Sequence, residues 1–156
     1  MASIYGFTLK NRKTFQGLDW QGNQGNLYCN GKKVAWYNDS GNGGSCDIVY
    51  YDNAYAPILE ETIKRYFKER PKITEYGELD GDEDLFMAEL LQLMDDEKEY
   101  KKAVKKDYSC LVTYTDANTH FPYSMMCNED TAQKMSNRAD ITELKIYRSK
   151  KDFIIE

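Results

Sequence analysis

An Asn-Gly pair between two apolar runs constrains the fold more than any other feature of this sequence. Asn30 and Gly31 separate "NLYC" from "KKVAWY". Asn-Gly is the preferred pair of a type I′ turn, because both central residues of that turn need positive φ. Apolar residues recur at every second position on either side, at Leu27, Cys29, Val34 and Trp36. The stretch therefore predicts a β-hairpin with its turn at Asn30-Gly31.

Other segments of the chain carry weaker strand patterns. Alternation or β-branched and aromatic content predicts strands in residues 3–10, 46–51, 108–115, 121–126, 141–148 and, at the end, 152–156. Residues 11–25, "NRKTFQGLDWQGNQG", contain three glycines and several turn formers, so they predict a long loop. Residues 38–45 contain three glycines and no apolar residue, and they predict a second loop.

The middle of the chain changes to a helical period. Pro57 suits a first helical turn and Pro71 ends the element, with one apolar face formed by Ile58, Leu59, Thr62, Ile63, Tyr66 and Phe67. A second helix is predicted from about Asp82 to Lys105, with Phe86, Leu90, Leu93, Met94 and Val104 as its buried stripe. A short third helix is predicted after Asn128, whose side chain suits an N-cap.

Together these elements predict an α+β fold, with a mostly antiparallel sheet of about five to seven strands, two main helices and one short helix. The length of 156 residues suits a single domain. Within it we distinguish an N-terminal β-hairpin region (1–55), a helical acidic segment (56–106) and a C-terminal ββαβ region (107–156).

Composition and cysteine usage predict a cytoplasmic protein. No apolar stretch approaches the roughly 20 residues that span a bilayer, and the first residues lack the pattern of a signal peptide. The four cysteines are therefore expected to be reduced thiols. They form no C-x-x-C pair, so we expect no metal site, and no motif calls for a cofactor.

Two glycine- or acid-rich motifs resemble ligand loops without meeting their requirements. The glycines at 41, 43 and 44 precede a strand rather than a helix and no Gly-Lys-Ser/Thr follows, so a connection within a sheet is preferred to a phosphate loop. In "DGDEDLFMAEL", Asp80, Asp82 and Asp84 match an EF-hand, but Leu85 and Leu91 stand where glycine and glutamate are needed.

Two catalytic alternatives stay open. His120 is the single histidine, and a dyad with Cys110 or Cys127 would depend on their meeting in space. Glu143 and Lys145 form an E-x-K pattern on a predicted strand, as in divalent-metal nucleases, with partner carboxylates among Asp116, Asp130 and Asp140. In a chain that is 30% charged, a solvated strand face is the preferred interpretation.

Acidic charge is concentrated in residues 75–99, which contain 11 acids and one lysine, a net −10 in a chain of net −5. A dense carboxylate surface can imitate a phosphate backbone and occupy the basic channel of a nucleic-acid enzyme. We therefore predict a non-enzymatic, macromolecule-binding protein, for which direct nucleic-acid binding is not expected. The predicted contact residues are Glu78, Asp80, Asp82, Glu83, Asp84, Asp95, Asp96 and Glu97, together with the aromatic residues Trp36 and Tyr37.

The hairpin also resembles a group of phage and mobile-element proteins with the pattern "LYxDGKKV" followed by "NDGxGG". The matching residues are Leu27-Tyr28, Asn30 to Val34, Asn38-Asp39 and Gly43-Gly44, about 20 residues in all. This resemblance implies a phage origin and a role in a bacterial host, but no reaction. By analogy with small acidic inhibitors of host defence, anti-CRISPR proteins among them, the expected partner is a basic host protein such as a defence nuclease. A small-ligand-binding module, with its pocket among the aromatic residues, and a homodimer stay open.

Overall fold

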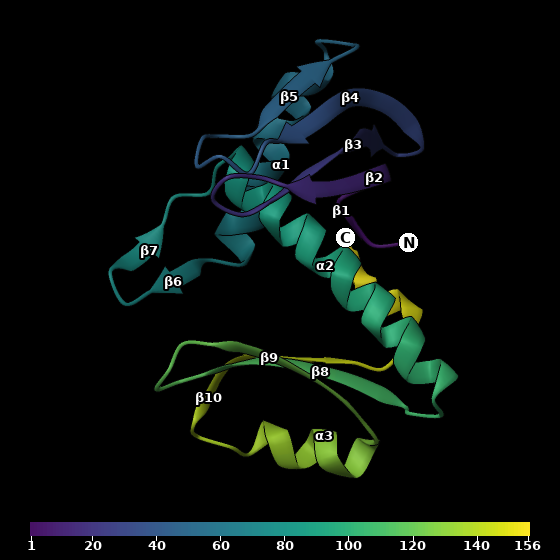
Figure 1. The fold of residues 1–156 in the computed structure, drawn as a ribbon, viewed down its shortest axis with the longest axis vertical. Helices are drawn as coiled ribbons and strands as arrows, with labels where there is room; N and C mark the ends of the chain where they lie inside the picture. Colours follow the sequence, from purple (N-terminus) through teal and green to yellow (C-terminus); the bar gives the residue numbers. More distant parts are fainter. The chain divides into compact units, whose positions relative to one another are not determined.

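A computed structural model describes all 156 residues and confirms an α+β fold with three α-helices (Figure 1). The chain divides into two compact units, which we describe separately. Unit 1 comprises Met1–Ala2 and Gln92–Ile155, and unit 2 comprises Ser3–Leu91 with Glu156. The boundary falls inside helix α2 (Glu83–Lys105), so this helix contributes residues to both units. That the chain is a single domain stays a prediction.

Unit 2 contains an antiparallel sheet whose strands lie in chain order. They are β1 (Ser3–Ile4), β2 (Phe7–Gln16), β3 (Gln21–Cys29), β4 (Lys32–Asp39) and β5 (Asp47–Tyr50). Asn30 and Gly31 join β3 to β4 with φ values of 48° and 83°, the positive angles that a type I′ turn needs. The hairpin predicted from this pair is confirmed.

Residues 11–25 are largely strand, so the prediction of a long loop there was wrong. The pairing of β2 with β3 continues through Thr14 opposite Asn23 and ends with Gln16 opposite Gln21. Only four residues remain in the turn between the two strands. The polar and glycine-rich composition, which favours loops in general, concealed the pairing. Strands can tolerate such residues when ladder hydrogen bonds satisfy the backbone.

The burial pattern of the hairpin differs from simple alternation because β4 contains a bulge. Leu27 lies opposite Ala35 and Tyr28 lies opposite Lys33, so Val34 has no partner of its own. An extra residue reverses which face the following side chains occupy. Val34, Ala35 and Tyr37 are therefore buried while Trp36 is only half-buried, so burial does not follow the period-two spacing of Val34 and Trp36.

The core of unit 2 forms where α1 (Tyr55–Glu69) and the first turns of α2 contribute apolar side chains alongside those of the sheet. Phe86 meets both Phe7 and Tyr66 edge to face, with ring centroids 6.3 and 5.9 Å apart. The predicted helical face of α1 is confirmed at its centre by the burial of Leu59, Ile63, Tyr66 and Phe67, whereas Ile58 is exposed. A separate two-stranded hairpin, β6 (Lys72–Thr74) with β7 (Gly77–Leu79), was not foreseen from the sequence.

Unit 1 contains a three-stranded antiparallel sheet and a short helix on one of its faces (Figure 1). The strand order is β10 (Ile141–Tyr147), β8 (Cys110–Asp116), β9 (Pro122–Cys127), and α3 (Glu129–Ser136) adds Ala132 and Met135 to their core. Asn128 precedes α3, but its side chain accepts a hydrogen bond from the Ser109 N–H instead of capping the helix. The 3₁₀-helix η1 (Lys150–Phe153) and strand β11 (Ile154–Ile155) end the chain.

The second half of α2 supplies unit 1 with Leu93, Tyr100 and Ala103, all buried. Phe86, Leu90 and Leu93 confirm the predicted stripe of this helix, but Val104 is exposed and does not belong to it. None of the helices combines the length and the apolar character needed to cross a lipid bilayer.

Candidate functional site

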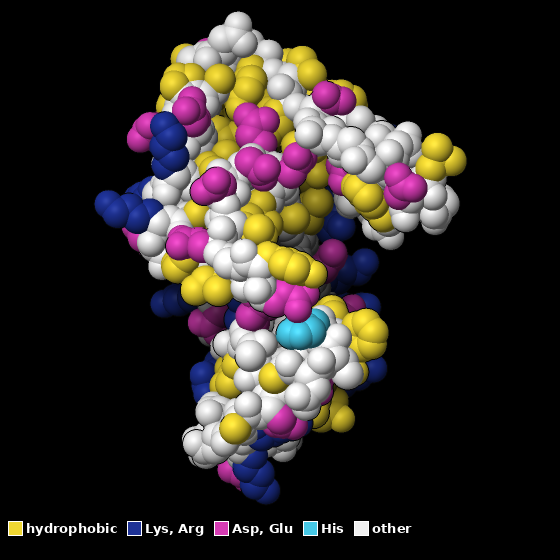
Figure 2. Space-filling view, turned by 90° about the vertical axis from the view of Figure 1, so that its left-hand side faces the viewer, with side chains coloured by type: hydrophobic (Ala, Val, Ile, Leu, Met, Phe, Trp, Pro, Cys, Tyr) yellow, Lys and Arg dark blue, Asp and Glu magenta, His cyan; other side chains and the backbone are white.

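A run of exposed carboxylates extends from β7 to the first turn of α2. It consists of Glu78, Asp80, Asp82, Glu83 and Asp84, all in unit 2. None of the five forms an ion pair with a lysine or arginine. Figure 2 shows acidic side chains gathered on the upper part of the face in view, with hydrophobic side chains beside them. We call these five residues the acidic run.

Two members of the acidic run also have structural roles. Asp82 accepts a hydrogen bond from the Leu85 N–H at 2.8 Å, which caps the start of α2. Asp84 accepts a hydrogen bond from the Cys46 N–H at 2.6 Å and so connects α2 to the residue that precedes β5. Partial burial opposes ionisation of Asp84, but the hydrogen bonds from Cys46 outweigh it and lower its pKa. Glu78 and Asp80 have no such role.

The electrostatics of Glu83 show that like charge accumulates here. Desolvation raises the pKa of Glu83, and the neighbouring carboxylates Asp84, Asp82 and Glu60 raise it further. A carboxyl group flanked by others loses part of its preference for the charged form. A cation brought to this surface would relieve that repulsion.

Three predicted contact residues lie instead in unit 1, and two of them are buried. Asp96 is 5% exposed and accepts hydrogen bonds from the Tyr147 hydroxyl at 2.9 Å and the Gln92 amide at 2.8 Å. Glu97 is 6% exposed and accepts a hydrogen bond from the Ala2 N–H. Their prediction as surface contacts is corrected, because both carboxylates are used inside the fold; Asp95 is exposed.

Glu97 is stabilised as a buried anion. Burial opposes its ionisation, but Lys101 at 3.0 Å and the Ala2 N–H outweigh that effect, so the pKa of Glu97 is lowered. A buried charge of this kind needs such partners because desolvation is costly. Its role in the fold is therefore structural.

The two aromatic residues predicted as contacts, Trp36 and Tyr37, differ in their burial. Tyr37 is 2% exposed, and its burial raises its pKa, so it belongs to the core and is corrected as a contact residue. Trp36 is half-buried on the opposite face of β4. The bulge at Val34 explains the exchange, since it turns Tyr37 rather than Trp36 inward.

Cys110 and Cys127 lie at the opposite end of the β8–β9 pair from His120 and do not form a nucleophilic pair with it. Cys110 and Cys127 are buried on neighbouring strands, and burial raises the pKa of each thiol. The Cys110 thiol donates to the Glu129 carboxylate, whereas His120 lies in the exposed turn after Asp116. Thiols with raised pKa values are poor nucleophiles.

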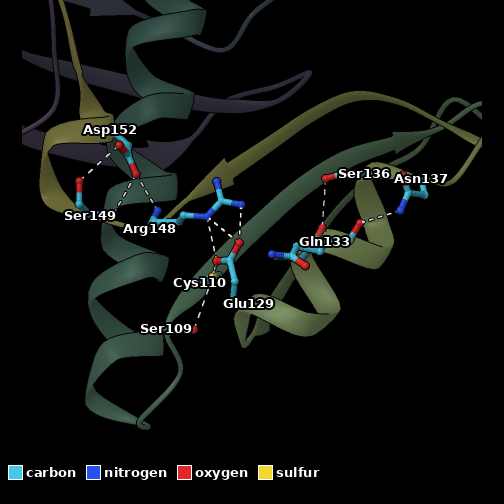
Figure 3. A network of polar contacts seen from close by, with 10 residues as sticks. Ser109, Cys110, Glu129, Gln133, Ser136, Asn137, Arg148, Ser149 and Asp152 are labelled. Atoms are coloured by element: carbon cyan, nitrogen blue, oxygen red, sulfur yellow. Dashed lines mark hydrogen bonds and ion pairs between the residues drawn. The ribbon is translucent and has the colours of Figure 1, made fainter.

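Glu129 is instead the centre of a structural network (Figure 3). The Arg148 guanidinium donates to both of its oxygens, at 2.8 Å from Nε and 2.7 Å from Nη2, and lowers the pKa of Glu129 to about 2. The Asp152 carboxylate accepts from the Arg148 and Ser149 N–H groups, at 2.6 and 2.8 Å. A bidentate arginine–carboxylate pair fixes the relative orientation of its two side chains. The Arg148–Glu129 pair joins the end of β10 to the start of α3, and the Asp152 hydrogen bonds join it to η1.

The E-x-K pattern does not assemble a metal centre. Opposite Tyr114, β10 has two residues, Glu143 and Leu144, and Glu143 has a positive φ of 52°, so strand alternation fails at this point. Asp140 is paired with Arg138, and Asp116 accepts the N–H groups of a turn. No group of three or more histidine, cysteine or carboxylate side chains is placed to hold a metal ion.

The glycine loop at residues 41–44 is part of the sheet architecture. The Gly41 carbonyl accepts hydrogen bonds from the N–H groups of Asp19 and Trp20, at 2.9 and 3.0 Å. The Asn42 side chain accepts another from the Leu18 N–H. The loop thus holds the β2–β3 turn, and the preference for a connection over a phosphate cradle is consistent with these contacts.

Two surface hollows lie along α1 in unit 2. The larger, of about 530 Å³, opens to solvent beside α1 and is lined by Tyr5, Pro57, Ile58, Glu61, Thr62 and Arg65. Arg65 stacks over Tyr5 with 4.1 Å between the guanidinium carbon and the ring centroid, and pairs with Glu69.

Comparison with known proteins adds no relative to this description. No family model, no curated protein and no solved structure matches the chain.

Proposed function

We propose that this protein is a non-enzymatic inhibitor, of phage or mobile-element origin, that binds a basic bacterial protein through the acidic run. Its target on this proposal is a nucleic-acid-binding defence enzyme, whose cationic channel accepts the carboxylates in place of phosphates. The observation that carries the proposal is the set of five exposed carboxylates without a cationic partner. Such a surface attracts a cationic partner over long range and releases counterions when it is neutralised.

The spacing of the acidic run supports this role better than a purely solubilising one. Solubility is served by charges of both signs dispersed over a surface. Here five acids occur within seven residues, and repulsion from Asp84 and Asp82 adds to desolvation in raising the pKa of Glu83. This repulsion is unfavourable, and of the five residues only Asp82 and Asp84 accept hydrogen bonds that stabilise the start of α2.

The test uses the two members that have no structural role. Glu78→Lys with Asp80→Lys changes the net charge from −5 to −1, and Asp130→Lys with Glu156→Lys makes the same change at exposed positions elsewhere. The wild-type protein and both variants are immobilised and exposed to a bacterial lysate. The partner that the wild type retains is identified by mass spectrometry and purified. Calorimetry at several salt concentrations then measures its affinity for the wild type and for each variant.

We expect the Glu78/Asp80 variant to bind at least about tenfold more weakly and with less salt dependence, and the control variant to bind nearly as the wild type does. Duplex DNA should compete with the wild-type protein for the partner. Equal affinity of the two variants, a partner that DNA does not displace, or no retained partner would each contradict the proposal.

A further inference from the structure

The β6–β7 hairpin exposes three large apolar side chains within seven residues. Ile73 is 69% exposed, Tyr76 is 91% exposed and Leu79 is 42% exposed. Ile73 pairs with Glu78 and Leu79 pairs with Lys72, so Ile73 and Leu79 lie on opposite faces of the hairpin, with Tyr76 at its turn. Single exposed apolar residues are ordinary on protein surfaces, but a group of them on one small element is typical of an interaction site. The sequence signal was "KITEYGEL", in which Glu75-Tyr76 separates two triplets.

The hairpin is built to hold these side chains in place. At its tip the Thr74 hydroxyl donates to the Gly77 carbonyl at 3.1 Å and accepts from the Tyr76 N–H at 3.2 Å. At its base Lys72 forms an ion pair with Glu89 at 3.2 Å. Gly81 follows so closely against the Phe67 ring that a Cβ at this position would overlap it. Both ends of the hairpin are thus fixed to unit 2.

The hairpin has no layer of its own to bury these side chains. Its sheet consists of two strands only, and Figure 1 shows it standing apart from the β1–β5 sheet of the same unit. A two-stranded hairpin is marginally stable unless a further layer covers it. Tyrosine gives a large contact area for little loss of conformational freedom, and it is enriched among residues that dominate binding.

The charges on the hairpin determine what can cover it. Glu75, Glu78 and Asp80 are exposed and alternate with the three apolar residues, while Lys72 already pairs with Glu89. This charge repels nucleic acid and anionic lipid, and it opposes contact between the hairpins of two copies. A protein surface with an apolar pocket and a rim of lysine or arginine complements it.

We infer that the β6–β7 hairpin inserts Tyr76, at its turn, and Ile73 into an apolar pocket of the partner protein, and that basic residues rim this pocket. The inference rests on the proposed function and adds the source of its specificity. The acidic residues steer the approach of the basic partner, and the apolar side chains of the hairpin slow the dissociation of the complex.

The experiment separates the apolar contribution from the charge. Ile73→Ala with Tyr76→Ala keeps every carboxylate, and Ile58→Ala with Tyr51→Ala removes the same two residue types at exposed positions outside the hairpin. The affinity of each is measured for the protein that the wild type retains from bacterial lysate. In parallel, a photoreactive phenylalanine analogue is placed at Tyr76 or, as control, at Tyr51, and adducts formed on illumination of bacteria are identified by mass spectrometry.

We expect the hairpin variant to bind at least about tenfold more weakly, mainly through faster dissociation, and the control variant to match the wild type. Adducts should form from position 76 but not from position 51, and should map to an apolar site near lysines or arginines of the partner.

If Ile73→Ala with Tyr76→Ala binds as the wild type does while Glu78→Lys with Asp80→Lys does not, the inference is wrong and the proposed function stands. If neither variant loses affinity, or if no partner is retained, both are wrong. Adducts that join two copies of this chain, or that contain lipid or nucleic acid, would replace the inferred partner with one of those.

Discussion

At the scale of single residues, Asp96 shows why an acidic run in a sequence is not the same as an acidic surface. It lies three residues after Leu93 and four before Tyr100, the spacing that places all three on one helical face. That period, rather than the local charge, decides its burial. Glu97 follows the same rule. The charge pattern alone could not separate these two from Glu78 and Asp80, which lie outside any helix.

The pair formed by Asp96 and Tyr147 gives the first stability prediction. Tyr147→Phe keeps the ring that stacks on Phe153, with centroids 4.4 Å apart, but removes the hydroxyl that donates to the buried carboxylate. A buried acceptor that loses a donor costs about 1–3 kcal/mol, so we expect the free energy of unfolding to fall by about that amount. Urea unfolding measures it. Tyr123→Phe, at a 48% exposed position, is the control and should change little; equal effects would contradict the assignment.

At the scale of elements, the sequence was sufficient where local chemistry decides the structure. The type I′ turn, the three helices and the three strands of unit 1 could be predicted because turn residues and periodicity act over short distances. The parts of β2 and β3 within residues 11–25 and the bulges at Val34 and Glu143 could not, because they depend on which strand pairs with which. The candidate surface was predicted only in part for the same reason: the β6–β7 hairpin has three-residue strands with no clear alternation.

The Asn30-Gly31 turn supplies a prediction with a closely matched control. A Cβ at Gly31 would meet no atom within 4 Å, and the same is true at Gly44, but only Gly31 has a positive φ, at 83°. Gly31→Ala should therefore lower the free energy of unfolding by about 1–2 kcal/mol through backbone conformation alone. Gly44→Ala should leave it nearly unchanged or raise it slightly. Thermal unfolding of both variants tests this, and a larger loss from Gly44→Ala would contradict it.

At the scale of the whole molecule, α2 is the element that both units share. Phe86, Met87 and Leu90 are buried in unit 2, whereas Leu93 and Tyr100 are buried in unit 1. If α2 unfolds, both units lose buried apolar side chains at the same time. We therefore expect the two units to unfold together, as the single domain predicted from the sequence would.

Gln92→Pro tests that coupling. Proline removes a helical hydrogen bond and clashes with the preceding turn, which costs about 3 kcal/mol or more in a helix interior. Both tryptophans, Trp20 and Trp36, lie in unit 2, so their fluorescence follows that unit while circular dichroism at 222 nm follows the whole chain. We expect both urea transitions to move together to lower concentration, with Gln92→Ala shifting them much less. A fluorescence transition that stays in place would show two independent domains.

The corner where the β2–β3 turn meets the glycine loop has a practical consequence for engineering. A Cβ on Gly17 would lie 2.6 Å from the Gly41 carbonyl oxygen, and the turn is held through the backbone of Asp19 and Trp20. Leu18, at the tip, is 89% exposed. Because main-chain atoms set the shape, position 18 can be randomised in a display library while Gly17 and Gly41 are kept, which makes this corner a ready site for grafting new recognition sequences.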